Sequence, residues 1–283
     1  MNISTELEKG LNKAQLTALH LIGAECDRQG KGSFLVGGTV RDVLLSRKVS
    51  DIDISLECHP SDVTTDISMS EGLEILSTTI FGTQKVRSGS ITMDLAMART
   101  EEYSTPAALP KVMPADIDAD LDRRDFTVNS MAVSLSSASW GQLLDPNRGL
   151  SDICERRIRV LHPASFHDDP TRIFRAFRYS ERLGFDIEIL TARLISKSTQ
   201  MVTELSGARI TNELISICQE PAAASILCQL DQYGVFSSID EKWVLSKRIF
   251  RSVKQLIDGN DSDLNSFFLV MVGELTPSHR DKL

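Results

Sequence analysis

The spacing of apolar residues predicts an alternation of helices and short strands in the first half of the chain. Leucine and isoleucine recur at near-helical intervals between Glu6 and Gln29, which predicts one amphipathic helix that ends at Gly30. Apolar or alternating runs bounded by glycine predict strands at 34–36, 51–54, 73–77, 83–87 and 91–98. A serine-aspartate start predicts a further helix over 61–70.

Prolines and helical spacing distinguish the regions that follow. Residues 104–119 contain Pro106, Pro110 and Pro114, which disfavour a continuous helix or a central strand, so a loop is expected there. From Pro221 onward, apolar residues at helical spacing predict helices over 222–233, 242–257 and 264–275.

The composition is that of a globular soluble protein. The chain has 283 residues, of which 41% are hydrophobic and 25% charged, enough for one large domain or two ordinary ones. Its start lacks a secretory signal, and its longest apolar run, 267–272, is too short to span a bilayer. A cytoplasmic protein without membrane contact is therefore expected. The net charge of −8 argues against a general nucleic-acid binder, so any RNA contact must come from a local patch.

Cysteine and histidine lack the spacing of a metal site. The five cysteines are odd in number, widely scattered and never in a C-x-x-C pair, which is typical of buried free thiols.

The glycine pair at 37–38 precedes the strongest candidate chemistry. Gly37 and Gly38 let the backbone bend sharply and approach a ligand closely. Asp51 and Asp53 alternate with isoleucines along the next strand, so both carboxylates point to the same side. Carboxylates this close repel unless a hard cation binds between them, and Mg²⁺ with phosphate oxygens is the usual occupant. A lone Asp-x-Asp is more typical of a half-buried strand with exposed acids, but the glycine turn favours the metal site.

Two further features combine charge with apolar surroundings. Asp94 is the only charge in 91–98, where a buried carboxylate needs a cation or hydrogen bonds; an acid at a strand end facing water would give the same pattern. Arg123 and Arg124 lie beside aspartates in 120–132, a segment that ends in a helical apolar face. In isolation such arginines indicate a solvated ion-pair cluster.

Residues 167–185 predict a helix with a cationic face. Asp168 is expected to be its N-cap, and Pro170 suits the first turn. The opposite face is apolar, and arginine recurs every three or four residues at Arg172, Arg175, Arg178 and Arg182. A solvated basic face is the simplest interpretation of this pattern alone.

Taken in order, these stretches resemble the signatures of the class II tRNA nucleotidyltransferases and bacterial poly(A) polymerases, within the polymerase β-like nucleotidyltransferase superfamily. The matching motifs are GGTVRD at 37–42 with DID at 51–53, RRDFTVNS at 123–130, LDPNRGLSD at 144–152, DDPTRIFRAFR at 168–178 and SGARITNEL at 206–214. The resemblance covers about residues 30–215 and departs from the usual pattern at Ser130, where alanine is common, and at Asp168, where glutamate is common.

The resemblance implies which residues bind metal and nucleotide. The carboxylates expected to hold two catalytic Mg²⁺ ions are Asp51, Asp53 and Asp94. The residues expected to bind the nucleotide are Gly37, Gly38, Arg41, Arg124, Asp169, Arg172, Arg175 and Arg178. Within this set, Asp169 and Arg172 are expected to pair with the Watson–Crick edge of the incoming base in place of a nucleic-acid template.

It also implies supporting roles. Asp125 is expected to position Arg124, and the acidic turn at 144–152 to couple the catalytic and base-reading parts. Arg209 and Glu213 either brace the base-reading helix or form a simple ion pair four residues apart. In family members a flexible loop at the position of 104–119 influences which nucleotide is added.

The fold implied is α+β: a head with a mixed sheet at 1–150, a helical base-reading neck at 151–220 and a partial helical body at 221–283. The implied reaction is attack of a tRNA 3′-hydroxyl on the α-phosphate of CTP or ATP, with release of pyrophosphate. Known members usually continue past the point where this chain stops. A naturally short protein, a fragment, and a chain completed by another chain are all left open, as is the oligomeric state.

Three rival interpretations also remain open. A poly(A) polymerase shares all these motifs, and CCA-adding, CC-adding and A-adding specialists are not ranked by them. A non-catalytic RNA- or nucleotide-binding remnant would keep the motifs without turnover. A small-molecule nucleotidyltransferase shares the glycine turn and Asp-x-Asp but gives no reason for the arginine helix.

Overall fold

The computed structural model describes residues 1–70, 72–79, 82–105, 107–108, 110–241, 243–258 and 264–272. The chain forms two compact units. The first comprises Met1–Glu102 and Lys111–Glu155, and the second comprises Tyr103–Pro110 and Arg156–Leu283. Each unit is described by itself below.

The first unit is built on a mixed seven-stranded sheet, as expected for an α+β head. The strand order is β3-β4-β5-β2-β1-β8-β9. Only β2 and β5 pair in parallel within it, and the other neighbours are antiparallel. The strands are β1 Ser33–Val36, β2 Asp53–Leu56, β3 Glu74–Thr78, β4 Gln84–Ser88, β5 Ile91–Met97, β8 Ala132–Ser134 and β9 Leu143–Leu144.

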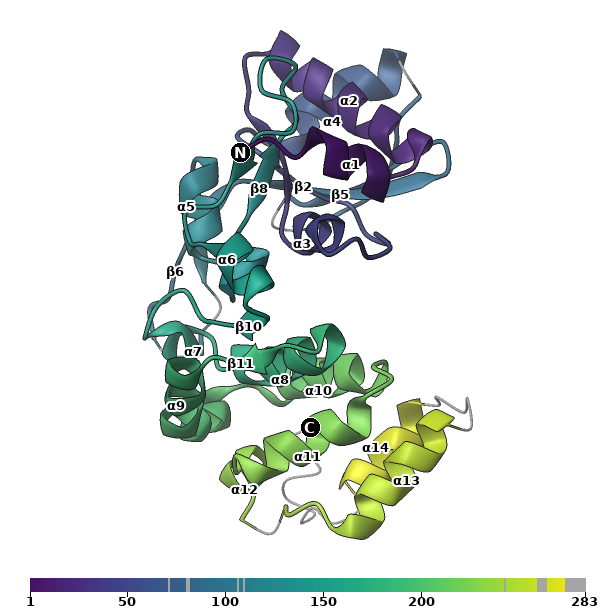
Figure 1. Ribbon diagram of the computed structural model, residues 1–283. Coiled ribbons are helices and arrows are strands. Elements are labelled where there is room, and N and C mark those ends of the chain that lie inside the picture. The colour runs from purple at the N-terminus through teal and green to yellow at the C-terminus, as the bar shows by residue number, and fades with distance from the viewer. Residues whose placement is uncertain are drawn as a thin grey trace. The chain divides into compact units, whose positions relative to one another are not determined.

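Helices cover both faces of this sheet. On one face, α2 (Lys13–Arg28) contacts β1 and β5, while α4 (Pro60–Ser70) contacts β3 and β5 (Figure 1). The other face is covered by α5 (Ile117–Asp122), whose apolar side chains join a buried cluster of Val36, Ile117, Leu121 and Ala132. Paired residues of neighbouring strands share a face, so the positions aligned with Val36 point to the α5 side.

The predicted single helix over 6–29 is wrong, because the chain forms two helices there. They are α1 (Ser4–Gly10) and α2, and Asn12 between them is the N-cap of α2. The Asn12 side chain accepts a hydrogen bond from the Gln15 N–H, and the Gln15 side chain accepts one from the Asn12 N–H. This reciprocal capping box begins a new helix inside a run whose leucine spacing looks continuous.

The predicted loop over 104–119 is also partly wrong. Residues Lys111–Pro114 form β7, which pairs antiparallel with β6 (Arg99–Glu102), and α5 begins at Ile117. Pro114 ends its strand, where a missing backbone N–H is tolerated. Pro106 lies outside the described residues.

The helical face expected at the end of 120–132 is not formed. Thr127–Asn129 is a single 3₁₀ turn, and β8 follows. Phe126, Val128 and Met131 are all fully buried, because this segment passes through the interior and every side of it meets protein. Apolar spacing therefore does not reveal a helix here. Ser130 is buried too, and its hydroxyl donates to the Leu121 carbonyl.

The second unit is helical apart from a short parallel pair, β10 (Arg157–Ile158) with β11 (Asp186–Ile187). Its described helices are α7 Ser165–Asp168, α8 Thr171–Leu183, α9 Ile189–Ser198, η2 Thr199–Glu204, α10 Gly207–Cys218, α11 Ala223–Gln232, α12 Val235–Ile239, α13 Lys247–Asp258 and α14 Leu264–Val272. The helices predicted from 222 onward correspond to α11, α13 and α14, with α12 in addition. Residues 242 and 273–275 of those predictions lie outside the described part.

Two further expectations concern the cysteines and the presence of membrane-spanning helices. The cysteines are free, as expected, but they are not all buried: Cys26 and Cys218 are, whereas Cys154 is exposed. Within the part of the chain that the structure describes, we find no helix with both the length and the apolar character needed to cross a membrane.

The capping box makes a prediction about stability. Replacing Asn12 with alanine leaves an N–H at the start of α2 without its acceptor, which typically costs about 1 kcal/mol. Asn12→Ala should therefore lower the free energy of unfolding in urea by about that amount, whereas Asn12→Asp, which keeps the acceptor, should not. Equal stability of both variants would contradict the role of this cap.

Candidate functional site

Asp53 and Asp94 lie side by side on the two parallel strands of the sheet. Asp53 begins β2, and its partner in the β2–β5 ladder is Asp94. The pairing extends one residue further back, because the Asp94 N–H donates to the Ile52 carbonyl at 2.8 Å. Asp51 lies just before the strand and is exposed, whereas Ile52 is buried. The alternation predicted from the sequence is confirmed, although β2 begins at Asp53 rather than at Asp51.

The electrostatics of this pair differ from those of an exposed acid. Burial raises the pKa of Asp53, and the neighbouring charges of Asp94 and Asp51 raise it further. Arg124 and Lys85 oppose that shift. The Lys85 ammonium lies 3.3 Å from a carboxylate oxygen of Asp94, which is half-exposed. Asp53 therefore carries a proton more readily than an isolated aspartate does.

The donors at this site are those a hard cation prefers, since carboxylate oxygens are the usual protein ligands of Mg²⁺. A divalent cation beside Asp53 and Asp94 would remove the repulsion that raises the pKa of Asp53. No three acidic, histidine or cysteine side chains among the described residues are already gathered into a metal-binding group. The Asp51 carboxylate instead accepts a hydrogen bond from the Ser50 hydroxyl at 2.9 Å. Two of the three predicted ligands are thus paired across the strands, and the third, Asp51, is near enough for its charge to raise the pKa of Asp53.

The glycine turn follows the last residue of β1 and leads into α3 (Gly38–Leu44). Gly37 has φ 65° and ψ −130°, a conformation that only glycine adopts readily. A Cβ atom at this position would lie 2.7 Å from Nη1 of Arg124. The glycine is therefore needed both for the backbone bend and for the close approach of this guanidinium.

Asp120 holds Arg124 against the turn. Nη2 of Arg124 donates to a carboxylate oxygen of Asp120 at 2.7 Å, and Asp120 is only 1% exposed. Burial alone would raise the pKa of Asp120, but the charges of Arg124 and Arg123 outweigh it and hold the pKa below its usual value. Asp120 therefore remains an anion inside the protein.

The expected positioning residue, Asp125, has other described partners. Its carboxylate accepts hydrogen bonds from the Phe126 N–H at 2.8 Å and from Nδ2 of Asn129 at 3.0 Å. Sequence reasoning missed Asp120 as the partner of Arg124. The signal that could have found it is the spacing of four residues between an acid and an arginine at the end of a short helix.

Arg41 is buried under the glycine turn. It is 4% exposed, forms an ion pair with Asp42, and donates through Nη1 to Oδ1 of Asn129 at 2.6 Å. A Cβ atom on Gly38 would meet the Arg41 guanidinium at 3.4 Å. This arginine therefore links the first signature to the second, and its role toward nucleotide stays a prediction.

The 144–152 motif makes hydrogen bonds that hold the 3₁₀ turn after Arg124. Asp145 accepts hydrogen bonds from the N–H groups of Gly149 and Leu150, which begin α6 (Gly149–Cys154). The buried Asp152 accepts the Thr127 hydroxyl at 2.6 Å. These contacts fix the 3₁₀ turn that follows Arg124, so within the first unit the motif acts as a brace.

In the second unit, Pro170 is the N-cap of the arginine helix, and Asp169 rather than Asp168 accepts the first N–H of that helix. The structure places Asp168 at the end of α7, and α8 begins at Thr171. Oδ1 of Asp169 accepts the Thr171 N–H at 3.0 Å and the Thr171 hydroxyl at 2.6 Å. The same oxygen accepts Nη2 of Arg209 at 2.7 Å. The helix starts after Pro170, so the acid directly before the proline is the one within reach of the first N–H group.

A solvated basic face, the simplest interpretation of the pattern alone, does not describe the whole arginine face of α8. Arg172 is 5% exposed and donates to the Ser165 hydroxyl at 2.6 Å. Further along, Arg182 pairs with Glu220. The guanidiniums of three arginines lie within 5.9 Å of the ring centre of Tyr179, namely Arg175, Arg178 and Arg182. The helix thus carries an ordered network around an aromatic residue that sequence reasoning overlooked.

The last motif makes contacts that favour the bracing interpretation. Arg209 reaches Asp169, at the start of α8, and also donates to the Ala107 carbonyl at 2.8 Å. Glu213 lies 3.9 Å from Arg178, in the middle of α8. Both residues of the motif therefore reach across to the arginine helix.

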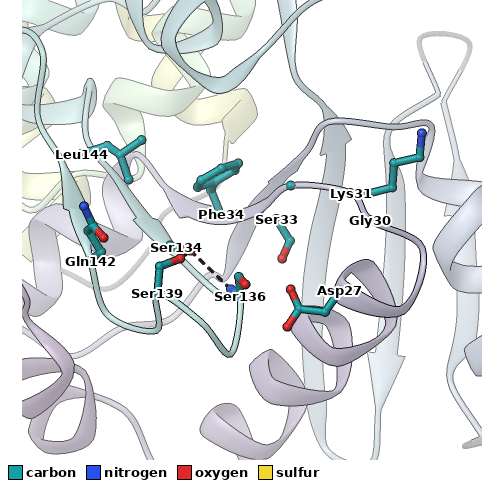
Figure 2. A pocket seen from close by; sticks show the side chains of 11 residues that line it. Asp27, Gly30, Lys31, Ser33, Phe34, Ser134, Ser136, Ser139, Gln142 and Leu144 are labelled. Atoms are coloured by element: carbon teal, nitrogen blue, oxygen red, sulfur yellow. Dashed lines mark hydrogen bonds between the residues drawn. The ribbon is translucent and has the colours of Figure 1, made fainter.

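A cavity of about 410 Å³ opens at the start of β1, away from the predicted site residues (Figure 2). Asp27, Lys31, Phe34 and several serines line it, and Ser134 accepts the Ser136 N–H there. None of the residues expected to bind metal or nucleotide lines this cavity.

Comparison with known proteins identifies the family. A family model described as "Poly A polymerase head domain" matches residues 33–159, and one described as "Probable RNA and SrmB- binding site of polymerase A" matches residues 184–239. The fold and motifs define a head of this type, followed along the chain by a segment of the RNA-binding type. The chain belongs to the family of tRNA nucleotidyltransferases and poly(A) polymerases.

Curated relatives and solved structures agree with this assignment. The chain is 34% identical over 226 residues to an A-adding tRNA nucleotidyltransferase of Aquifex aeolicus, covering 79% of this chain and 27% of the relative. It is also 34% identical over 271 residues to an A-adding tRNA nucleotidyltransferase of Geobacter sulfurreducens, covering 95% of this chain and 30% of the relative. The chain thus spans less than a third of the length of these two relatives.

Two solved structures have a similar fold. A CCA-adding enzyme in an apo form matches with a TM-score of 0.91 and 28% identity, covering 99% of this chain and 69% of that one. A tRNA nucleotidyltransferase complexed with a primer tRNA and an incoming ATP analog matches with a TM-score of 0.77 and 28% identity, covering 93% of this chain and 79% of that one.

The raised pKa of Asp53 predicts that this residue opposes folding at neutral pH. Folding favours its protonated form, so its contribution to stability is fully present below the ordinary pKa of 3.8 and is lost as the pH rises through the folded-state pKa. Asp53→Asn removes the charge and should raise the melting temperature at pH 7. The gain should shrink as the pH is lowered toward 3.8. A variant less stable than wild type at pH 7 would contradict this expectation.

The glycine turn predicts an unusually costly substitution. Gly37→Ala combines a strained backbone, worth about 1–3 kcal/mol, with a clash against Arg124. Gly89→Ala is a control for a positive φ without a clash, because Gly89 has a φ of 58° and no atom lies within 4 Å of its added Cβ. Urea unfolding should show the larger loss of stability for Gly37→Ala. Equal losses would mean that Arg124 yields without cost.

Proposed function

We propose that the chain carries out template-independent nucleotidyl transfer, adding C, A or both to the 3′ end of tRNA from CTP or ATP with release of pyrophosphate. The observation that carries the proposal is the convergence, within one unit, of the Asp53–Asp94 pair, the Gly37 turn and the Arg124 guanidinium. Acidic oxygens for a metal and a cation beside an open turn are what a triphosphate substrate requires.

In this proposal Asp51, Asp53 and Asp94 hold Mg²⁺. When bound, the metal would lower the pKa of the attacking hydroxyl and neutralise charge on the leaving pyrophosphate. The glycine turn admits the triphosphate close to the backbone, and Arg124 donates to its oxygens through the nitrogen that faces Gly37. Transfer forms a bond between the RNA 3′ oxygen and the α-phosphorus and breaks the bond from that phosphorus to the pyrophosphate oxygen, while the hydroxyl proton is released.

Asp169 and Arg172 select the base in this proposal. All the described hydrogen bonds of Asp169 fall on Oδ1, and the side chain is 20% exposed. Among the described residues, Oδ2 has no hydrogen-bond donor and can accept the amino group of cytosine or adenine. Arg172 would donate to ring and carbonyl acceptors. Arg175 and Arg178 would add positive charge for the triphosphate or the RNA.

Poly(A) polymerase activity is the second candidate, because one matching family model is described by that name. The curated relatives are named for adding A to tRNA, which favours tRNA as the acceptor. With tRNA as substrate, we propose a cytoplasmic location.

A tRNA extension assay tests the proposal. The purified chain is given Mg²⁺ and a tRNA that ends before CCA, with CTP alone, ATP alone or both, and in parallel a generic RNA. At most three additions, confined to tRNA and abolished by chelation of Mg²⁺, are expected. Long A tails on generic RNA would favour the poly(A) polymerase. Nucleotide binding without any transfer would favour a non-catalytic remnant.

Substitutions in the carboxylate pair test the metal assignment. Asp94→Asn and Asp53→Asn should each lower the transfer rate by at least about 100-fold, since the metal supplies much of the charge stabilisation. Glu74→Gln is the control, because Glu74 lies on the edge strand β3 and pairs with Arg87 in an exposed ion pair. Circular dichroism should show that all three variants are folded. Near-normal transfer by either aspartate variant would remove it from the metal site.

A further inference from the structure

Asp120 divides its two carboxylate oxygens between different tasks. Oδ1 accepts the backbone N–H of Arg99 at 3.2 Å and two donors of Arg123, Nε at 3.0 Å and Nη2 at 2.7 Å. Oδ2 accepts Nη2 of Arg124 at 2.7 Å. One oxygen is therefore anchored by three donors, and the other is directed at the arginine of the proposed site.

Arg123, which binds Oδ1 of Asp120, is itself held by residues of β6. Arg123 donates through Nη1 to Glu101 at 2.9 Å and through Nε to the Arg99 carbonyl at 3.0 Å. Asp120 is 1% exposed, and the charges of two arginines keep it ionised against its burial. Asp120 is thus fixed by charged hydrogen bonds from two arginines as well as by a backbone N–H of β6.

The Arg124 guanidinium, by contrast, is fixed on one side only. Nη2 is bound to Asp120, Nε is buried without a hydrogen bond, and Nη1 faces Gly37. Arginine has many rotamers and loses conformational freedom when it is immobilised. The Asp120 bond meets that cost before any ligand arrives, so Nη1 is presented to the turn in one orientation.

We propose that Asp120 is the positioning residue for Arg124: it does not touch the nucleotide, but it fixes the guanidinium that binds the triphosphate. This inference rests on the proposed nucleotidyl transfer. Removing the Asp120 charge should weaken nucleotide binding and leave binding of the RNA acceptor unchanged.

Asp120→Asn separates the two tasks, because asparagine keeps only one acceptor oxygen. The orientation that preserves the three bonds of Oδ1 places the amide NH₂ against Arg124, where two donors face each other. The fold is thus retained while Arg124 loses its partner. We expect the KM for CTP and ATP to rise about 10-fold or more, the KM for tRNA to stay at the wild-type value, and the Asp118→Asn control on the exposed side of α5 to behave as wild type.

A double-mutant cycle distinguishes positioning from a general structural role. If Asp120 acts through Arg124, then Asp120→Asn adds no further loss when it is combined with Arg124→Gln, and the pair is as impaired as Arg124→Gln alone. Additive losses, or an unchanged KM for nucleotide in Asp120→Asn, would overturn the proposal. If Asp120→Asn does not fold, Asp120→Glu replaces it, since the longer side chain keeps the charge but displaces the oxygen; a wild-type nucleotide KM in that variant would be equally decisive against it.

The same cycle can be measured as the dissociation constant of CTP or ATP by equilibrium dialysis. This measurement tests the positioning role of Asp120 separately from the proposed nucleotidyl transfer. A wild-type chain that binds nucleotide but transfers none contradicts the proposed function, yet non-additive losses of affinity would still support the positioning role. A wild-type chain that transfers nucleotide with an additive cycle contradicts only the role of Asp120.

Discussion

Repulsion between two carboxylates on adjacent parallel strands is the constraint around which the first unit is built. The β2–β5 pairing puts Asp53 opposite Asp94, where burial and like charge both disfavour the ionised form. A protein that needed only stability would place an apolar or neutral residue at one of these positions. The nearby cations, Lys85 and Arg124, reduce the penalty without removing it, since the pKa of Asp53 is still raised. Both acids are nevertheless retained at neighbouring positions of the sheet.

A buried network of polar side chains connects the glycine turn with the later motifs of the first unit. Arg41 joins the glycine turn to Asn129, and Asn129 joins Asp125, which lies two residues before the 3₁₀ turn. The 144–152 motif then fixes that turn through Asp152. Motifs that are separated along the sequence are thus successive links in one chain of hydrogen bonds. Such networks are costly when incomplete, which restricts how far any single member can be changed.

How much of this could be read from the sequence depended on the kind of signal. The strands, the glycine turn and the alternation at 51–54 follow from period-two alternation and glycine placement, both of which are local. The place of Asp94 beside Asp53 was expected from the resemblance alone, because the pairing of strands is not local. The break at Asn12, the strand at Lys111–Pro114 and the 3₁₀ turn at Thr127 depend on a capping bond, a partner strand and complete burial. Periodicity does not contain that information. Asp120 and Tyr179 were overlooked for a related reason: their importance lies in side-chain contacts that arise only when the helices are packed.

The start of α8 has a consequence for how such a protein can change over evolutionary time. The single carboxylate of Asp169 accepts the N–H and the hydroxyl of Thr171 at the start of α8, and it also binds Arg209. The same carboxylate is the group proposed to face the base. Any substitution that alters the pattern offered to the base also removes the acceptor of the first N–H of α8 and the ion-pair partner of Arg209. A shift in nucleotide preference by this route therefore requires a compensating change elsewhere, and lineages that diverge in specificity are expected to do so through neighbouring residues while this aspartate stays in place.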